Sequence, residues 1–155
     1  MSPPFGAIVV LYDRNGRDMA KCEEIRKKFN ECSVGRLLGI EVLEVREGIA
    51  RGRMLVRKEH LNVFGGIHGG ILFAFADHVG GACGNSMDYK ALLVESTARF
   101  KKSAREGQTI YAEARLVHSR KKVDTIDITV TNGNGEALAV LKMTSFIVED
   151  AAETS

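Results

Sequence analysis

The segment spanning residues 68–87 limits the possible folds of this 155-residue chain more than any other feature. Apolar side chains recur along it at helical spacing in two neighbouring rows, and few polar residues separate them. A helix that is apolar nearly all round must be buried nearly all round. Asp77 and His78 argue against a membrane span, because an ionised group at mid-membrane costs roughly 2.5–3.5 kcal/mol. The segment therefore predicts a central helix that the rest of a globular domain covers.

Glycines in the second half of this helix indicate close packing. Gly80, Gly81 and Gly84 are poor helix formers, each costing about 1 kcal/mol relative to Ala. Their presence is explained if strands or a partner helix approach the helix backbone closely.

Alternating apolar and polar residues predict an antiparallel sheet around the central helix. Two strands are expected before the helix and four after it, at residues 40–46, 48–56, 94–100, 110–117, 123–131 and 137–148. Each has one apolar face for the core and one polar face for solvent. The stretch Asn132-Gly133-Asn134-Gly135 predicts the last hairpin, because Asn and Gly tolerate the positive φ of such turns. The fold class is therefore α+β, with an antiparallel sheet wrapped around one long helix.

The chain length suits a single domain with one core. We expect an N-terminal appendage at residues 1–18 with a short strand at 7–12, the domain at 19–150 and a C-terminal tail at 151–155. An amphipathic helix is expected over residues 19–29, and Met19 is an alternative natural start. Three cysteines without a CxxC pair, and no secretory signal, predict a cytoplasmic protein. The net charge of +2 does not indicate a nucleic-acid partner, and no membrane partner is expected because Asp77 and His78 interrupt the apolar segment.

The entrance of the central helix carries the first chemical signal. Gly69 and Gly70 leave backbone N–H groups uncovered at the helix N-terminus, where the macrodipole adds positive potential. Such a place suits a carbonyl oxygen that becomes negative during acyl transfer. The other interpretation, that the glycines only allow a tight loop-to-helix entry, stays equally open.

Asp77 carries the second signal, because charged residues are seldom buried unless they are paired or functional. Its alternative roles are a place on the one wet stripe of the helix or the capping of a neighbouring strand. Asp77 lies more than two helical turns beyond His68. The Asp77 of one subunit could therefore work beside the Gly69 amide of another, which requires a dimer.

Together these residues resemble the hotdog-fold acyl-CoA thioesterases, most closely the phenylacetate-degradation type. The hallmark of that family is an Asn, a Gly, a His-Gly-Gly and then an Asp on the central helix, read here as Asn62, Gly65, His68-Gly69-Gly70 and Asp77. The stretch from Phe100 to Gly107 also resembles the strand and turn of the family. The resemblance covers residues 35–148.

This resemblance implies a hotdog fold, hydrolysis of acyl- or aryl-CoA thioesters, and no cofactor beyond the coenzyme A of the substrate. It implies that the Gly69 amide polarises the thioester carbonyl and that Asp77 of the opposing subunit acts as general base or as nucleophile. Asn62 would place water or the acyl group, and His68 would orient the carbonyl or hold the loop. The protein is expected to be at least a homodimer, with a homotetramer expected from the family.

Two positions depart from the family pattern. Leu93 stands where the family often has a Ser or Thr near the catalytic water, and Ser103 stands where it has Pro. Ser96 is not expected to replace the missing hydroxyl, because a shift of odd length along a strand changes the face.

Basic residues near the expected strand ends could bind the phosphates of coenzyme A. The Gly70 amide is a further expected contact with the substrate. The basic residues are Lys101, Lys102, Arg105, Arg120 and Lys121. For any single one of them a solvated turn is the simpler interpretation. His60, His78 and His118 are scattered without a pair at ligand spacing, so no metal site is expected.

Two other functions fit the same scaffold. One is a non-catalytic module that binds or senses acyl-CoA, against which the presence of Asp77 argues. The other is a hydratase or dehydratase, which also uses a buried acid and a His but matches the His-Gly-Gly and Asp77 pattern less well. The pattern does not indicate which acyl group is bound.

Overall fold

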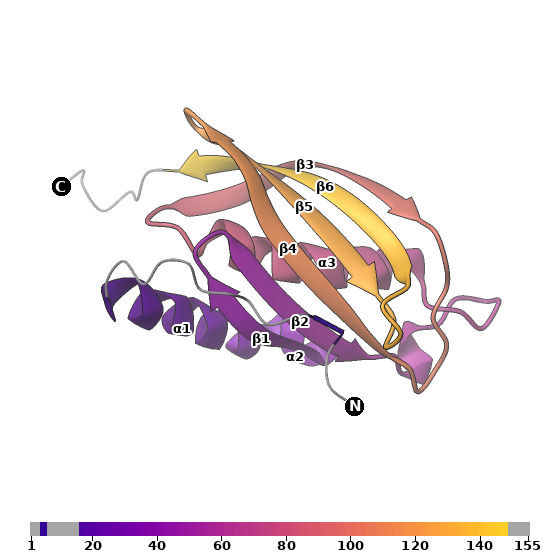
Figure 1. The fold of residues 1–155 in the computed structure, drawn as a ribbon. Coiled ribbons are helices and arrows are strands. Elements are labelled where there is room, and N and C mark those ends of the chain that lie inside the picture. Colours follow the sequence, from indigo (N-terminus) through magenta and orange to yellow (C-terminus); the bar gives the residue numbers. More distant parts are fainter. Residues whose placement is uncertain (1–3, 6–15, 149–155) are drawn as a thin grey trace.

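The computed structural model describes residues 4–5 and 16–148. The expected strand at 7–12 and the expected tail at 151–155 lie outside the described residues. Within the described residues the elements follow in this order (Figure 1): α1 (Gly16–Glu31), α2 (Ser33–Leu38), β1 (Ile40–Arg46), β2 (Ile49–Leu55), the 3₁₀ turn η1 (Lys58–His60), α3 (Gly69–Gly84), β3 (Lys90–Phe100), β4 (Thr109–Arg120), β5 (Val123–Thr131) and β6 (Ala137–Val148).

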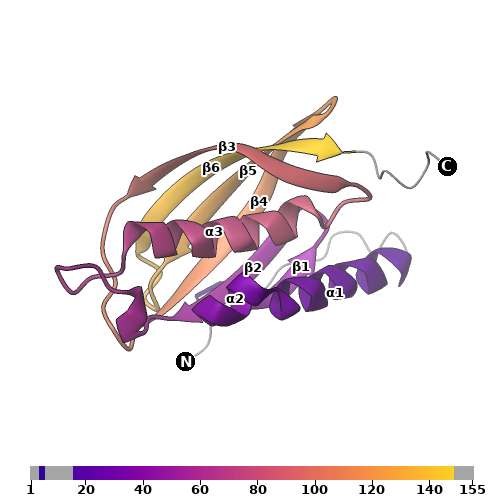
Figure 2. The same cartoon turned by 180° about the vertical axis from the view of Figure 1, so that it is seen from behind.

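The six strands form one antiparallel sheet in the order β1-β2-β4-β5-β6-β3. The sheet curves around α3, which lies along its inner face, while α1 and α2 lie beside β1 on the same side (Figure 2). This is the arrangement expected for a hotdog fold, and the prediction is confirmed. In the described part of the chain, no helix has both the length and the apolar character needed to cross a membrane.

The core forms where the inner face of the sheet meets α3. The burial of alternate strand residues follows from the two-residue period of a strand. Large buried side chains of this layer include Met54, Leu72, Phe75, Val79, Ile110, Ile126, Ile128 and Met143.

The glycines of α3 permit this close packing, as expected. A Cβ atom on Gly80 would lie 2.6 Å from the Ile128 Cδ1 of β5. A Cβ atom on Gly81 would lie 3.1 Å from the Phe29 Cε1 of α1. Strands therefore approach one side of the helix backbone and α1 approaches another.

The second helix, α2, was not expected from the sequence. Its N-cap residue, Cys32, makes no side-chain capping hydrogen bond, so the usual Ser, Thr, Asp or Asn signal is missing at that position. Its end is marked by Gly39, whose φ of 70° is the left-handed conformation that closes many helices. Helix α1 also begins before the expected start, and α3 ends at Gly84 before the expected residue 87.

Strand β3 contains a bulge between Leu93 and Glu95. Residues that are directly paired in a sheet share a face. The β3 residues that pair with β6 and point towards the inner face are Ala91, Leu93, Ser96, Ala98 and Phe100. Because the bulge adds one residue, Ser96 lies on the same face as Leu93. The expectation that an odd shift places Ser96 on the opposite face is therefore wrong.

The bulge also changes the exposure of β3, which forms one edge of the sheet. Val94, the first residue of the strand expected at 94–100, lies in the bulge and is 62% exposed. Leu92 and Leu93 are also exposed, so the edge is apolar. An exposed, apolar strand edge is a template for pairing with another chain.

Candidate active site

The first turn of α3 leaves one backbone donor uncovered. His68 is the N-cap residue, with φ of −66° and ψ of 132°. Its Nδ1 accepts a hydrogen bond from the Gly70 N–H at 2.9 Å, and its carbonyl accepts from Ile71 and Leu72 at 3.0 Å each. The Gly69 N–H donates to no acceptor among the described residues. Of the N–H groups that open this helix, the Gly69 amide is therefore the one available to a ligand.

This capping also fixes the state of the His68 ring. A nitrogen that accepts a hydrogen bond carries no proton, so the neutral ring has its proton on Nε2. The His68 side chain is exposed, so its Nε2–H is open to a ligand. The Gly70 amide was also expected to be uncovered, but this expectation is wrong because its N–H donates to the His68 ring.

Asn62 holds the loop that leads to α3. Its Oδ1 accepts hydrogen bonds from the Phe64 N–H at 2.9 Å and the Gly66 N–H at 3.3 Å. A bridge between Leu61 and Ile67 closes the loop. The Nδ2 of Asn62 donates to no acceptor in the described part of the chain, which leaves this group available.

Phe100, at the end of β3, forms an apolar wall beside the amide. A Cβ atom on Gly69 would lie 3.7 Å from the Phe100 Cζ, which is ordinary van der Waals contact. The Phe100 side chain is 54% exposed, so the ring also has a free surface. Sequence reasoning had assigned Phe100 only to a strand, because the contact joins residues that are distant in the chain.

Asp77 lies half-buried on a stripe of α3 that faces away from the inner face of the sheet. The stripe consists of Gly70, Phe73, Ala74 and Asp77, which recur every three or four residues and are more exposed than the rest of the helix. Burial raises the pKa of the Asp77 carboxyl, and the neighbouring His78 lowers it by less. No described residue donates a hydrogen bond to this carboxylate. Asp77 thus has the free lone pairs and the raised basicity that a general base needs.

His78 follows Asp77 in sequence but is held by another element. Its Nε2 lies 2.9 Å from the carbonyl oxygen of Phe29, to which the Nε2–H donates, and its ring packs edge-on against the Phe29 ring at 5.2 Å. Burial lowers the pKa of His78. His78 therefore joins α3 to α1.

Gly69 and Asp77 of one chain do not meet over one reacting carbonyl. They are eight residues apart on α3, which corresponds to about 12 Å along the helix axis. Within one chain the Gly69 amide and the Asp77 residue therefore lie at two separate places on α3.

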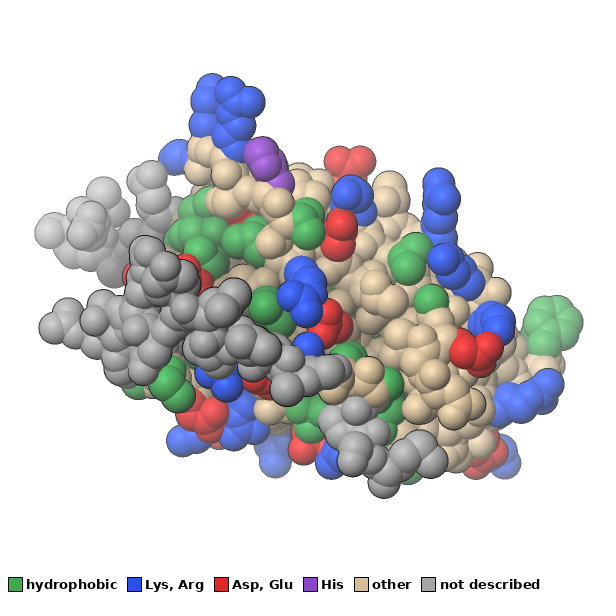
Figure 3. Space-filling model, viewed as in Figure 1, with side chains coloured by type: hydrophobic (Ala, Val, Ile, Leu, Met, Phe, Trp, Pro, Cys, Tyr) green, Lys and Arg blue, Asp and Glu red, His purple; other side chains and the backbone are tan. Residues whose placement is uncertain are grey.

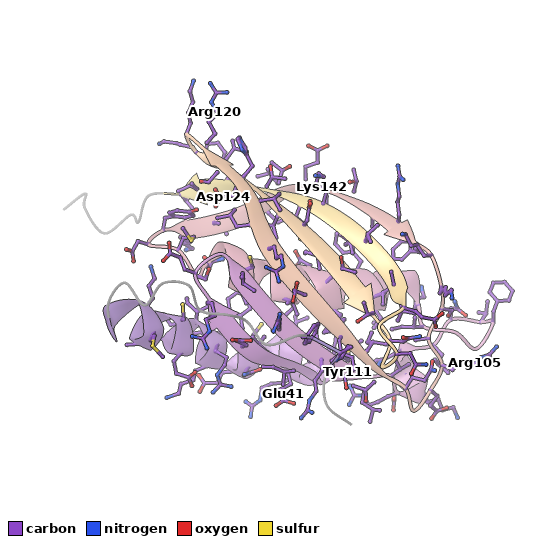
Figure 4. All side chains as sticks on the ribbon, in the orientation of Figure 1. Glu41, Arg105, Tyr111, Arg120, Asp124 and Lys142 are labelled. Atoms are coloured by element: carbon purple, nitrogen blue, oxygen red, sulfur yellow. The ribbon has the colours of Figure 1, made fainter. Side chains whose placement is uncertain are left out.

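The basic residues expected to bind phosphate do not form one cluster in the chain. Lys101, Lys102 and Arg105 precede β4, whereas Arg120 is its last residue and Lys121 lies in the β4–β5 hairpin turn. Figure 4 shows Arg105 and Arg120 at opposite ends of the sheet. Lys102 is also paired with Glu136 at 2.6 Å.

Among the described residues, the outer face of the sheet shows no single basic patch either. Lysine and arginine side chains alternate there with Asp and Glu (Figure 3), as in the cross-strand pairs Arg51–Glu113 at 2.7 Å and Lys142–Asp127 at 3.1 Å. Charges on this face are therefore largely compensated.

Other candidate groups are inert or dispersed. Burial raises the pKa of the Cys83 thiol to about 12, so Cys83 carries almost no thiolate at neutral pH. Within residues 4–5 and 16–148, no three His, Cys, Asp or Glu side chains lie together as potential metal ligands.

Comparisons with known proteins identify similar sequences and folds. Residues 64–139 match the family described as Thioesterase superfamily. A protein named putative esterase from Archaeoglobus fulgidus is 38% identical over 120 residues, covering 77% of this chain and 78% of its own length. The acyl-coenzyme A thioesterase PaaI of Escherichia coli K12 is 30% identical over 114 residues, covering 74% of this chain and 81% of its own.

Solved structures show the same architecture. The structure of E. coli PaaI superposes with a TM-score of 0.80 at 26% identity, covering 84% of this chain and 95% of that one. The structure of smu.793 from Streptococcus mutans UA159, bound to acetyl CoA, superposes with a TM-score of 0.68 at 27% identity. That match covers 70% of this chain and 88% of smu.793.

Proposed function

This chain belongs to the thioesterase superfamily, and from this premise we propose that it hydrolyses acyl-coenzyme A thioesters to the free acid and coenzyme A. The observation that carries the proposal is the free Gly69 N–H at the start of α3, together with the half-buried Asp77 carboxylate on the open stripe of the same helix. The name of E. coli PaaI and the acetyl CoA in smu.793 support coenzyme A esters as the substrate class. No cofactor is required beyond the coenzyme A that the substrate carries.

The Gly69 amide polarises the thioester carbonyl in this proposal. It donates to the carbonyl oxygen, which becomes negative when water attacks the carbon. The positive end of the α3 dipole stabilises the same charge. The Nε2–H of His68 is a second donor beside it, and Asn62 keeps the loop in shape through Oδ1.

Asp77 activates the water. The ionised carboxylate accepts a proton as the water oxygen bonds to the carbonyl carbon, and the proton passes to the sulfur as the carbon–sulfur bond breaks. A raised pKa makes the carboxylate a stronger base. In the alternative route, the Asp77 carboxylate attacks the carbonyl carbon and the carbon–sulfur bond breaks, which gives a mixed anhydride and the coenzyme A thiolate. Water then hydrolyses the anhydride to the free acid and the Asp77 carboxylate, and the proton released goes to the thiolate.

A second copy of the chain completes the site. The Gly69 amide of one chain needs an Asp77 carboxylate within reach, and its own lies about 12 Å away along α3. The apolar, unpaired edge of β3 suits pairing with an identical edge around a twofold axis. We infer at least a homodimer, and a homotetramer remains the proposal from the family.

Such pairing also brings the two basic groups closer. Two β3 edges related by a twofold axis run antiparallel. The hairpin of one chain with Arg120 and Lys121 then lies at the same end of the dimer as the segment of the other chain with Lys101, Lys102 and Arg105. Coenzyme A phosphates bind at this end in the proposal, near the Gly69 amide.

The test measures free thiol released from phenylacetyl-, hydroxybenzoyl-, short-chain and long-chain acyl-CoA. Wild type is compared with Asp77→Asn and with Asp88→Asn, a control at an exposed Asp paired with Lys21. We expect wild-type turnover, a loss of about 10²–10⁴-fold in folded Asp77→Asn, and no loss in Asp88→Asn. An inactive wild type across the panel would refute the hydrolase, and bound but unhydrolysed esters would favour the non-catalytic module.

A further inference from the structure

His60 is a buried histidine for which the proposed mechanism has no role. Its side chain is 1% exposed and lies in the 3₁₀ turn η1 before the site loop. Two reciprocal hydrogen bonds join it to Arg57: the Arg57 N–H donates to Nδ1 at 3.1 Å, and the His60 N–H donates to the Arg57 carbonyl at 2.9 Å. The position of His60 is therefore fixed through its ring as well as its backbone.

His60 in turn holds the residue before the Gly69 amide. The carbonyl of His60 accepts a hydrogen bond from the His68 N–H at 2.8 Å. The His68 carbonyl, which shares a peptide plane with the Gly69 N–H, accepts from Ile71 and Leu72. His68 is thus held on both sides, and its contact with His60 sets how the Gly69 N–H points from the helix end.

Arg57 anchors this arrangement to a second element. Its Nη2 donates to the Leu37 carbonyl at the end of α2 at 2.6 Å and lies 3.3 Å from the His60 Nε2. Burial lowers the pKa of His60 and the Arg57 charge lowers it further, while Glu59 opposes them. A lowered pKa favours the neutral ring, and the hydrogen bond from the Arg57 N–H makes Nδ1 the acceptor. The ring proton is then on Nε2, so the 3.3 Å approach of the Arg57 Nη2 is a contact and not a hydrogen bond.

We propose that His60 is a positioning residue for the thioester-polarising amide, acting through its Nδ1 acceptor and its carbonyl on the His68–Gly69 peptide. This inference rests on the proposed hydrolase function. No short sequence motif indicated this role of His60, because His60 and His68 come into contact only when the loop between them closes.

The test uses two substitutions that differ in where they place an acceptor. The Oδ1 of His60→Asn can take the place of Nδ1, whereas the Oε1 of His60→Gln corresponds to Nε2. Ser86→Ala is the stability control, because buried Ser86 accepts from the Gly48 N–H at 2.8 Å and donates to the Cys83 carbonyl at 2.6 Å beyond the other end of α3. The measurements are kcat, KM and Tm with the best acyl-CoA, and hydrogen exchange at the His68 amide.

We expect His60→Gln to lose about 10–100-fold in kcat, because small misplacements of a group that acts in the transition state are costly, while KM changes little. His60→Asn should retain most of the kcat, and Ser86→Ala should lower Tm without lowering kcat. The His68 amide should exchange faster in His60→Gln than in His60→Asn.

Three results would overturn this role while leaving the hydrolase intact. They are an undiminished kcat in His60→Gln, an equal loss in the Asn and Gln variants, or a kcat loss in Ser86→Ala as large as that in His60→Gln. An inactive wild-type protein would instead refute the proposed function, and the role of His60 with it.

Discussion

Gly69→Pro tests the polarising amide by removing its hydrogen atom and little else. Gly69 is the first residue of α3, the position at which proline is best tolerated because its fixed φ suits the helix and its missing N–H has no intrahelical partner. His68, with ψ of 132°, already has the extended conformation that a following proline requires. A new Cβ atom would meet Phe100 at 3.7 Å, which is ordinary contact.

The magnitudes follow from these contacts. The Gly69 N–H makes no hydrogen bond within the described chain, so its loss removes no folding interaction identified there. Replacing glycine by proline at a compatible site stabilises a protein by about 0.4–1 kcal/mol through the unfolded state. For a chain of this size we expect a Tm rise of about 1–4 °C. Loss of one oxyanion donor should lower kcat by about 10²–10³-fold.

The assay is thiol release at saturating substrate together with thermal unfolding of the same samples. Gly69→Ala is the matched control, since it adds the Cβ atom but keeps the N–H, and it should retain kcat within about 3-fold because the donor of the oxyanion interaction is unchanged. A folded Gly69→Pro protein with wild-type kcat would refute the role of the amide. Equal losses in both variants would show that bulk against Phe100, not the donor, is responsible.

Three further predictions concern stability and assembly. Burial raises the folded-state pKa of Asp77 above its ordinary value near 3.8, so ionisation of this carboxyl opposes folding. Asp77→Asn should therefore raise Tm at pH 7, and this gain in Tm should vanish as the pH falls below 3.8. A gain in Tm that does not depend on pH would contradict the burial argument. Tyr89→Phe removes the 2.6 Å hydrogen bond to fully buried Asp124 and should lower the free energy of unfolding by about 1–3 kcal/mol, with kcat unchanged. Denaturant titration measures this loss, and an unaltered midpoint of the unfolding transition would contradict the prediction. Val94→Lys places a charge on the exposed β3 edge and should yield inactive monomers in analytical ultracentrifugation, whereas an intact dimer would show that the edge is not the interface.

Much of the fold follows from periodicity in the sequence. The apolar segment around Phe75 and Val79 dictates a covered helix, and the alternation in residues 123–131 survives unchanged in β5. The helix that was missed, α2, is six residues long and has no side-chain N-cap. Neither a helical spacing of apolar residues nor a capping residue therefore indicates it in the sequence. The bulge in β3 was also missed, since alternation cannot show where one extra residue enters a strand.

The candidate site is local in some parts and distant in others. The free Gly69 amide could be inferred from the order of residues at one helix end, whereas the hydrogen bond from the Gly70 amide to the His68 ring could not. The contact of Phe100 with Gly69 and the hydrogen bond from His68 to His60 depend on loop closure and sheet order, which the sequence does not encode at short range. The separation of Arg105 from Arg120 likewise follows from the direction of β4.

The central claim is that each site combines Gly69 of one chain with Asp77 of another. Its most direct test mixes two inactive proteins, Gly69→Pro and Asp77→Asn, under conditions in which differently tagged chains are shown by native mass spectrometry to exchange. In a mixed dimer one site has both groups intact and the other has neither, so an equal mixture should recover about one quarter of wild-type activity. If both groups act within one chain, every site keeps one defect, and fully exchanged mixtures that remain inactive would contradict the account.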